Sequence, residues 1–362
     1  MMMEFQVLKS KAWRCTFLIS WEYDGRVRNL LIDGGPKAAY VSQGRPKEVQ
    51  KALDRLKQRG ERIDLLILTH VDDDHIGGLL EGFKHNGLLR GLTDEVWFNS
   101  GSLIDQAFGQ PIDESHLLEF DMVRTGTSAD NQTSIKQGVN FESVISELGI
   151  WDKQLVEAGS CLNFHGASIT LLSPTREKLK SLLIKWEKET ESNETSAATK
   201  DYDLSFDELL ADDQFNGNTS IHNESSIALL FEYEGQRLLL LGDASDDVVV
   251  NSIRALKNNE GHFYSEDNPL EVDYIKLSHH GSQYNTSPDF LRMIKSKHFI
   301  ISTDGSSHGL PNKRTLARVA KAHPNATFLF NYPNLINKIF TATELLLLEE
   351  DGYRFKNCDD MY

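Results

Sequence analysis

The fold of this chain is decided by the stretch Leu68-Thr69-His70-Val71-Asp72-Asp73-Asp74-His75-Ile76-Gly77-Gly78. Directly after the apolar run 63–68, it places five side chains of metal-binding type within six positions. Imidazoles and carboxylates this crowded would repel or desolvate one another unless a positive charge held them, and a divalent cation meets that need. The stretch therefore predicts a metal site at the end of a strand.

The composition is that of an ordinary soluble protein. With 362 residues, 40% hydrophobic and 25% charged, the chain is long enough to bury a full core as one large domain or two small ones, and we expect the first, a single domain over 1–362. The apolar runs are too short for a membrane span, and the N-terminus lacks the layout of a secretory signal. We therefore expect a cytoplasmic protein without a membrane partner. The net charge of −16 argues against broad adhesion to nucleic acid, although a local basic groove is compatible with it.

The three cysteines, Cys15, Cys161 and Cys358, are odd in number and far apart, and no two form a CxxC pair. This pattern predicts neither a disulfide framework nor a cysteine-based zinc site. We expect plain thiols.

Short apolar stretches rich in β-branched and aromatic residues alternate with helical patterns along the chain. The predicted strands are 16–21, 29–32, 63–68, 95–98, 168–172, 226–233, 237–241, 274–277 and 299–302. The predicted helices include 46–59, 246–258, 287–294 and 312–323. Turn residues join the first strand pair and also join 226–233 to 237–241, so both pairs are expected to be hairpins. The pattern predicts an α/β fold in which two sheets pack face to face with helices outside.

Two segments differ from the rest. Residues 176–218 are polar and partly acidic, and residues 101–159 have few strand signals. We interpret both as insertions in the single domain, the first of them partly mobile and the second forming helices and loops over the site.

Further candidate ligands stand just after other predicted strands. Asp33 follows 29–32, Asp243 follows 237–241, and the pair His279-His280 follows 274–277. His308 comes shortly after 299–302. Strand ends are rigid positions from which side chains distant in sequence converge, so these residues are expected near the first cluster.

The motifs together resemble a known family. They are Asp33-Gly34-Gly35, His70-x-Asp72-x-Asp74-His75, Asn223-Glu224-Ser225-Ser226, Gly242-Asp243, His279-His280-Gly281-Ser282, and His308 with Pro311. This series is similar to that of the metallo-β-lactamase-fold hydrolases, in the branch resembling the soluble domain of the ComEC-type DNA-uptake protein. The resemblance implies an αββα sandwich of two mixed β-sheets with helices on the outer faces.

The resemblance also implies roles for individual residues. His70 and Asp72 would serve a first metal position, Asp74, His75 and His280 a second, and Asp243 would bridge them. Asp33 would orient a histidine ligand from outside. It further implies catalytic roles for Asp74, His279 and His308. His279 would lie outside the metal ligands, and His308 would donate a proton or contact the phosphate. The residues implied to bind substrate are Asn223, Ser282, Lys313 and Arg314.

Two departures from the family pattern bear on the metal. Most members carry histidine where this chain has Asp72, and the third histidine of the first position is absent, with Asn223 or Glu224 near its place. Carboxylate oxygen in place of imidazole nitrogen shifts preference toward harder cations. We therefore expect Mn²⁺, with Zn²⁺ or Mg²⁺ as alternatives, bound as one ion or two.

The substrate is less constrained, because this fold acts on lactams, thioesters, lactones and phosphodiesters. The branch resemblance favours phosphodiesters. A basic strip beside the site would let a phosphate backbone approach an acidic protein, but a solvated helix face explains the same pattern equally well. The strip comprises Lys313, Arg314, Arg318 and Lys321, preceded by Arg292, Lys295 and Lys297.

Three interpretations stay open. The first is a metal-dependent phosphodiesterase or nuclease acting on DNA, RNA or nucleotides. The second is a small-molecule ester or lactone hydrolase, against which Asp72 and the absent third histidine count. The third is a weakly active subunit of a larger, defence-related assembly whose protein partner contacts the insertions. The oligomeric state is not indicated by the sequence.

Overall fold

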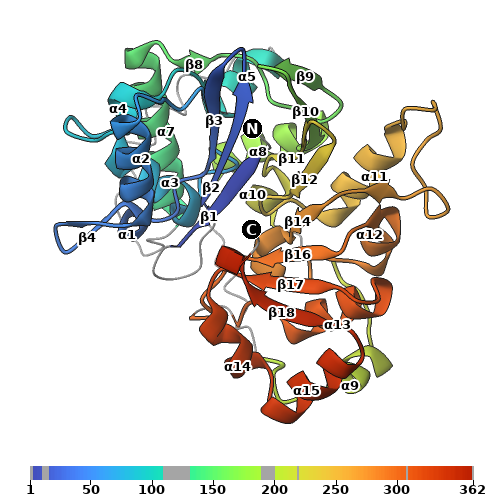
Figure 1. The fold of residues 1–362 in the computed structure, drawn as a ribbon. Coiled ribbons are helices and arrows are strands. Elements are labelled where there is room, and N and C mark those ends of the chain that lie inside the picture. The colour runs from blue at the N-terminus through green and yellow to red at the C-terminus, as the bar shows by residue number, and fades with distance from the viewer. Residues whose placement is uncertain are drawn as a thin grey trace.

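Two β-sheets lie face to face in the computed structural model, with helices on their outer sides (Figure 1). The structure describes residues 3–9, 16–108, 131–188, 200–217, 220–306 and 309–360. The first sheet contains, in spatial order, β1 (Glu4–Leu8), β2 (Thr16–Tyr23), β3 (Arg26–Ile32), β6 (Leu65–Ile67), β7 (Val96–Trp97) and β8 (Trp151–Asp152). The second contains β18 (Arg354–Asn357), β17 (Thr327–Phe330), β16 (His298–Ile301), β14 (Tyr274–Lys276), β12 (Gln236–Leu240), β11 (Ala228–Tyr233), β10 (Ala167–Ser173) and β9 (Cys161–Phe164).

Both sheets are mixed. In the first, β1, β2 and β3 are antiparallel, whereas β3, β6, β7 and β8 run parallel. In the second, β9 to β12 are antiparallel, and β12, β14, β16, β17 and β18 run parallel. Small two-stranded ribbons lie outside them, β4 (Val41–Ser42) with β5 (Arg45–Pro46) and β13 (Leu270–Glu271) with β15 (Ile294–Lys295).

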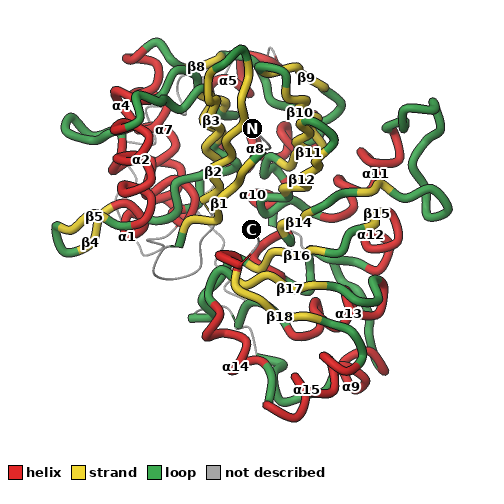
Figure 2. Tube along the Cα trace, in the orientation of Figure 1, coloured by secondary structure: helices red, strands yellow, loops and turns green. Residues whose placement is uncertain are grey.

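The helices form two outer layers, seen as red coils flanking the yellow strands (Figure 2). On the first sheet lie α1 (Lys37–Tyr40), α2 (Glu48–Gln58), α3 (Asp73–Gly82), α4 (Leu89–Leu92) and α7 (Asn131–Leu148). On the second lie α11 (Asp246–Ala255), α12 (Pro288–Met293), α13 (Lys313–Ala322), α14 (Ile336–Ile339) and α15 (Ala342–Glu350), with α9 (Phe206–Ala211) against α13. Helices α5 (Gly101–Phe108), α8 (Arg176–Lys188) and α10 (Ile221–Glu224) contact one another in series.

Strand periodicity divides most of the buried apolar residues in the described part of the chain among three cores. Leu30 and Ile32 of β3 point into the space between the sheets, whereas Leu31 points to the outer helices. The inner core continues with Phe231 and Leu229 of β11, and a third core lies under α11, α12 and α13. Because successive strand residues face opposite sides, a sheet with an apolar core on both faces needs a nearly continuous apolar run. The expected αββα sandwich is confirmed.

Both predicted hairpins are confirmed. β2 pairs with β3 around Asp24 and Gly25, which have φ of 51° and 69°. β11 pairs with β12 around Glu234 and Gly235, with φ of 47° and 82°. Two successive residues with positive φ match the twist of the flanking strands, and Gly adopts such φ without strain.

The described segments that were predicted to be insertions take part in the core to different degrees. Phe141 and Ile145 of α7 are fully buried against the outer helices of the first sheet, so part of 101–159 belongs to the sandwich. Residues 109–130, 189–199 and 218–219 lie outside the described part, and the assignment of 101–159 and 176–218 as insertions stays a prediction.

No helix in the described part combines the length and apolarity needed to cross a bilayer. Cys161 is exposed and Cys358 is buried, and Cys15 lies outside the described residues.

Candidate metal centre

Four segments carry the candidate ligands to the place where the two sheets meet. β6 leads through Leu68 to His70, and α3 then presents Asp74 and His75 in its first turn. β12 leads to Asp243, and β14 leads to a tight turn of residues 278–281. Backbone hydrogen bonds join them: Ile227 N–H donates to the Thr69 carbonyl at 3.0 Å and His279 N–H to the Gly242 carbonyl at 3.1 Å. The strand ends of the two sheets are thus tied together at this site.

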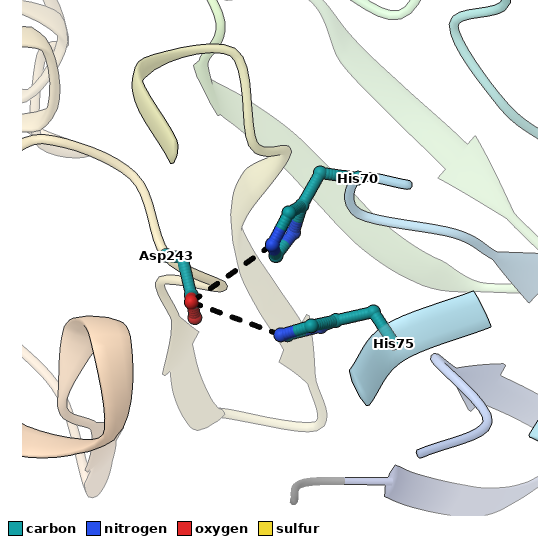
Figure 3. A group of neighbouring side chains, drawn as sticks. All are labelled: His70, His75 and Asp243. Carbon is teal, nitrogen blue, oxygen red and sulfur yellow. Dashed lines mark ion pairs between the residues drawn. The ribbon is translucent and has the colours of Figure 1, made fainter. Parts of the chain in front are cut away.

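Asp243 is the common point of the imidazoles. Its Oδ2 lies 3.7 Å from His75 Nε2 and 3.9 Å from His70 Nε2 (Figure 3). The Nε2 atoms of His279 and His280 both lie 3.9 Å from the same oxygen. Separations of this size are those between two ligand atoms on one cation, given bonds of about 2.0 to 2.2 Å.

Two further carboxylates complete the group. Asp74 Oδ2 lies 3.3 Å from His280 Nε2 and 3.6 Å from His75 Nε2. Asp72 Oδ2 lies 3.6 Å from His70 Nε2. The six residues expected as metal ligands, His70, Asp72, Asp74, His75, Asp243 and His280, are therefore gathered in one place.

Asp33 fixes the orientation of His75. One of its oxygens, Oδ2, accepts from His75 Nδ1 at 2.6 Å and from the Thr69 hydroxyl at 2.9 Å, and Oδ1 accepts from Thr69 N–H at 2.8 Å. The residue has a left-handed φ of 58°, which is uncommon outside Gly and Asn, and is 3% exposed. Because Nδ1 is the donor to Asp33, Nε2 of His75 is the nitrogen aimed at Asp74 and Asp243.

The centre is buried on one side and open on the other. The side chains of His75 and His280 are 1% exposed and that of Asp243 is 4% exposed, whereas Asp74 and Asp72 are 23% and 37% exposed. A substrate can therefore reach the centre from the side of the two aspartates.

The residues present fit a divalent cation. His70 Nε2 and His75 Nε2 are buried polar atoms without a hydrogen-bond partner among the residues that the structure describes. Buried polar atoms in folded proteins are almost always satisfied, so two unsatisfied imidazole nitrogens beside one carboxylate are typical of a metal site. Imidazole nitrogens with carboxylate oxygens suit Zn²⁺, Mn²⁺ or Fe²⁺.

The pKa shifts describe the same electrostatics. Burial would raise the pKa of Asp243, but His280, His75, His279 and Lys276 outweigh it and hold that pKa well below its usual value. Burial would lower the pKa of His75, but three carboxylates, Asp33 foremost, raise it well above its usual value. The pKa of Asp74 is lowered because His75 and His280 outweigh burial.

Lys276 was not anticipated as part of the site. It is 3% exposed, its ammonium donates to the Gly242 carbonyl, and Nζ lies 3.5 Å from Asp243 Oδ1. This contact holds one oxygen of Asp243 and leaves Oδ2 toward the imidazoles. The sequence held one sign of this role, a single lysine within the apolar strand 274–277. Lysine is rarely fully buried without a partner, so a lysine in a buried strand indicates a nearby acceptor or acid.

The residues expected to contact substrate have different surroundings. Asn223 is 7% exposed, and its amide nitrogen lies 3.3 Å from His279 Nδ1. Ser282 is 2% exposed, and its hydroxyl accepts from Tyr284 N–H at 3.2 Å. Glu224, the alternative to Asn223 for the place of the absent histidine, pairs instead with Lys178 at 2.9 Å. His308 lies outside the described residues.

Lys313 and Arg314 require a correction. Lys313 is 1% exposed, and its ammonium donates to Glu344 at 2.6 Å and to the Tyr202 carbonyl at 3.0 Å. Arg314 donates to the Leu209 carbonyl and lies 3.3 Å from Asp213. Both side chains fasten α13 to neighbouring segments, so we do not retain them as substrate contacts.

Acidic partners also neutralise much of the remaining basic strip. Arg318 is 3% exposed and pairs with Asp213 at 2.6 Å. Arg292 pairs with Glu266 at 2.9 Å, and Lys295 with Glu271 at 2.6 Å. The spacing that indicated a phosphate-binding strip in the sequence thus includes a buried ion pair at Arg318 and exposed ion pairs at Arg292 and Lys295.

Comparisons with known proteins show what this chain is similar to. Residues 20–106 match the family model of the metallo-β-lactamase superfamily. ComE operon protein 3 of Bacillus subtilis (strain 168) is 22% identical over 324 residues, which cover 85% of this chain. The chain spans 30% of the length of that relative.

Similar solved structures are related at low identity. Zn²⁺-bound PqqB from Methylobacterium extorquens is 14% identical with a TM-score of 0.38, over 93% of this chain and 84% of that one. The metallo-β-lactamase-fold protein YhfI from Bacillus subtilis is 12% identical with a TM-score of 0.35, over 98% and 95%.

Proposed function

We propose that this chain, which has the metallo-β-lactamase fold, is a metal-dependent hydrolase that cleaves phosphodiester bonds in DNA or RNA. The metal dependence in this proposal rests on one observation, the convergence of imidazoles from both sheets on Asp243 Oδ2. The distances to that oxygen are 3.7 Å for His75 and 3.9 Å for His70 and His280. Buried ligand atoms without other partners support the same conclusion.

The protein's own residues prepare the centre. Asp33 and the Ser302 carbonyl hold Nδ1 of His75 and His280 at 2.6 and 2.9 Å, which leaves each Nε2 facing inward. Such preorganisation removes the need for side chains to rearrange during reaction. A bound divalent cation would supply an acidified water and stabilise negative charge on the reacting oxygens.

The carboxylates on the open side of the centre predict that both substrate binding and cleavage require metal. Asp72 and Asp74 are the more exposed carboxylates there, and they repel an approaching phosphate unless cations neutralise them. Chelation should therefore abolish the binding of a phosphodiester as well as its cleavage. A neutral lactone or ester would not be repelled in this way.

The choice of phosphodiester substrates rests on the sequence motifs, which resemble the DNA-uptake branch, and on the likeness to ComE operon protein 3. The choice of Mn²⁺ rests on Asp72, an oxygen ligand at a position where most relatives place histidine. The basic strip does not support the proposal, because much of it is internally paired.

The test is hydrolysis by the full chain after removal of metal. Single- and double-stranded DNA and RNA, a lactone, a thioester and a β-lactam are each incubated with Mn²⁺, Mg²⁺ or Zn²⁺. We expect cleavage of a nucleic acid, fastest with Mn²⁺, and a loss of at least about 100-fold in Asp74→Asn and in Asp243→Asn. The exposed control Asp267→Asn should match the parent. Turnover of the small molecules alone would refute the nuclease assignment.

A further inference from the structure

His279 lies as close to Asp243 as two of the residues already identified as candidate ligands. Its Nε2 lies 3.9 Å from Asp243 Oδ2, the same separation as for His70 and His280. His279 was expected to lie outside the metal ligands, because it is His280 that precedes the glycine of the motif. In the structure the two neighbouring imidazoles instead approach the same carboxylate oxygen.

The opposite nitrogen of each imidazole is held by an oxygen of the protein. Nδ1 of His75 faces Asp33 Oδ2 at 2.6 Å, Nδ1 of His280 faces the Ser302 carbonyl at 2.9 Å, and Nδ1 of His70 faces the Thr69 hydroxyl at 3.0 Å. For His279 the oxygen is Oδ1 of Asn285, at 3.1 Å. An acceptor behind Nδ1 is the usual arrangement of histidines that bind metal through Nε2.

The partners of Asn285 settle which nitrogen of His279 carries the proton. Asn285 is 1% exposed, and its amide nitrogen donates to the carbonyls of Asp243 and Ala244 at 3.2 and 3.3 Å. Its remaining atom, Oδ1, is an acceptor only, so Nδ1 of His279 must be the donor. In the neutral imidazole this leaves the lone pair on Nε2, which faces Asp243. The Asn223 amide, near the same Nδ1, can turn its oxygen to that N–H as a second acceptor.

The backbone at His279 and His280 has an unfavourable conformation that turns both side chains toward Asp243. His279 and His280 have φ of 44° and 55°, both left-handed, and Gly281 follows with φ of 86°. Left-handed backbone is unfavourable for residues other than Gly, because it brings Cβ too close to the following carbonyl oxygen. Along an extended strand, adjacent side chains would point to opposite faces, whereas in this turn both face Asp243. Strain of this kind persists where the surrounding structure imposes it, and it occurs most often at functional sites.

We infer that His279 is a ligand of the metal centre through Nε2 and takes the role of the third histidine that the family pattern leaves without a residue here. The assignment rests on the proposed metal-dependent function. A second observation concerns Asn223, which stands near the position where the family pattern places that histidine. Its side chain contacts the ring of His279.

Metal binding tests the assignment without reference to activity. The full chain is stripped of metal and titrated with Mn²⁺ by calorimetry, and bound manganese is counted by mass spectrometry after dialysis. The variant His279→Asn is suited to the test because Asn tolerates left-handed backbone. His279→Gly removes the side chain altogether. The control is His262→Gln, whose histidine side chain is 72% exposed.

We expect both His279 variants to lose one equivalent of Mn²⁺, or to bind it at least about 10-fold more weakly, with the control unchanged. The absorption of the Co²⁺-loaded protein should also change, because one nitrogen ligand is removed. Parental Mn²⁺ stoichiometry and affinity in both variants would overturn the assignment and leave the metal-dependent function intact. A parent protein that binds no divalent metal would overturn the function as well.

Discussion

Contacts from several segments fix the orientation of the His75 side chain and shift its pKa. Asp33 holds its Nδ1 at 2.6 Å, and Asp74 and Asp243 lie 3.6 and 3.7 Å from its Nε2. These carboxylates raise the pKa of His75 well above its usual value, although burial alone would lower it. Metal ligands must be deprotonated, so a cation that binds here competes with a proton for His75.

His323 is a titratable residue whose surroundings are apolar. It is 8% exposed and its ring lies 5.0 Å from that of Phe299. Burial lowers its pKa from 6.5 to about 4, opposed by a hydrogen bond with the backbone of Leu291. Between these pH values the unfolded chain binds a proton that the folded protein does not. The contribution of His323 to the free energy of unfolding therefore decreases as pH falls through this window.

The expected loss is up to about 3 kcal/mol between pH 6.5 and 4. His323→Leu should flatten the pH dependence of the free energy of unfolding in this range, as measured by urea denaturation. His262→Gln, at an exposed site, should retain the parental slope. Equal slopes in parent and His323→Leu would show that the native state does not keep this imidazole neutral.

Helix α3 illustrates how an element places a ligand. Its fit against the loop after β3 depends on close backbone contact: Gly34 N–H donates to the His75 carbonyl at 2.8 Å, and Gly78 N–H donates to the Gly35 carbonyl at 2.7 Å. A Cβ on Gly78 would coincide with the Gly34 carbonyl oxygen, which is backbone and cannot turn away. The Gly-Gly pair after His75 is thus needed for packing.

Gly78→Ala should lower the free energy of unfolding by about 1 to 3 kcal/mol, because α3 must move away from the loop. The same movement displaces His75, so Mn²⁺ affinity should fall as well. The matched control is Gly91→Ala in α4, where a Cβ meets nothing within 4 Å. That change should be neutral or stabilising by up to about 1 kcal/mol. Chemical denaturation and calorimetry measure both effects, and similar results for the two variants would contradict the packing argument.

Helix α13 shows an element whose sequence suggested one role and whose contacts give another. Its basic residues recur at helical spacing, which is typical of a phosphate-binding face. In the structure Arg318 and Arg314 converge on Asp213, and Lys313 pairs with Glu344 of α15. The acidic partners lie about 30 to 100 residues away in sequence, so helical periodicity alone could not reveal the pairing.

At the scale of the whole molecule, the candidate metal ligands come from both sheets. His70 and His75 follow β6 of the first sheet, whereas Asp243 and His280 follow β12 and β14 of the second. A ligand that binds only the folded state stabilises it by about 2.7 kcal/mol at a concentration 100 times its Kd. A bound cation should therefore stabilise the sandwich as a unit.

Addition of Mn²⁺ to the metal-free protein should raise Tm by a few degrees in differential scanning calorimetry, and excess EDTA should reverse the rise. Asp243→Asn should show little or no rise, because its carboxylate is the point on which the imidazoles converge. Asp267→Asn should behave as the parent. An equal rise in Asp243→Asn would place the stabilising metal elsewhere in the molecule.

Much of the fold followed from local sequence. Each of the predicted strands is present in the structure, and α2, α11, α12 and α13 lie within the predicted helical segments. Several short strands were missed, among them β1, β9, β17 and β18. The burial of β18 alternates between exposed and half-buried because it lies at a sheet edge, and edge strands give a weaker apolar signal.

The sequence by itself determined the sandwich and the identity of six candidate ligands, because apolar periodicity and short motifs at strand ends are local properties of the chain. The tertiary structure decided which polar groups face one another. It turned His279 toward Asp243, buried Lys276 beside the same carboxylate, and paired the basic residues of α13 with distant acids. Those outcomes depend on backbone conformation and long-range contacts, and neither is encoded in spacing along the sequence.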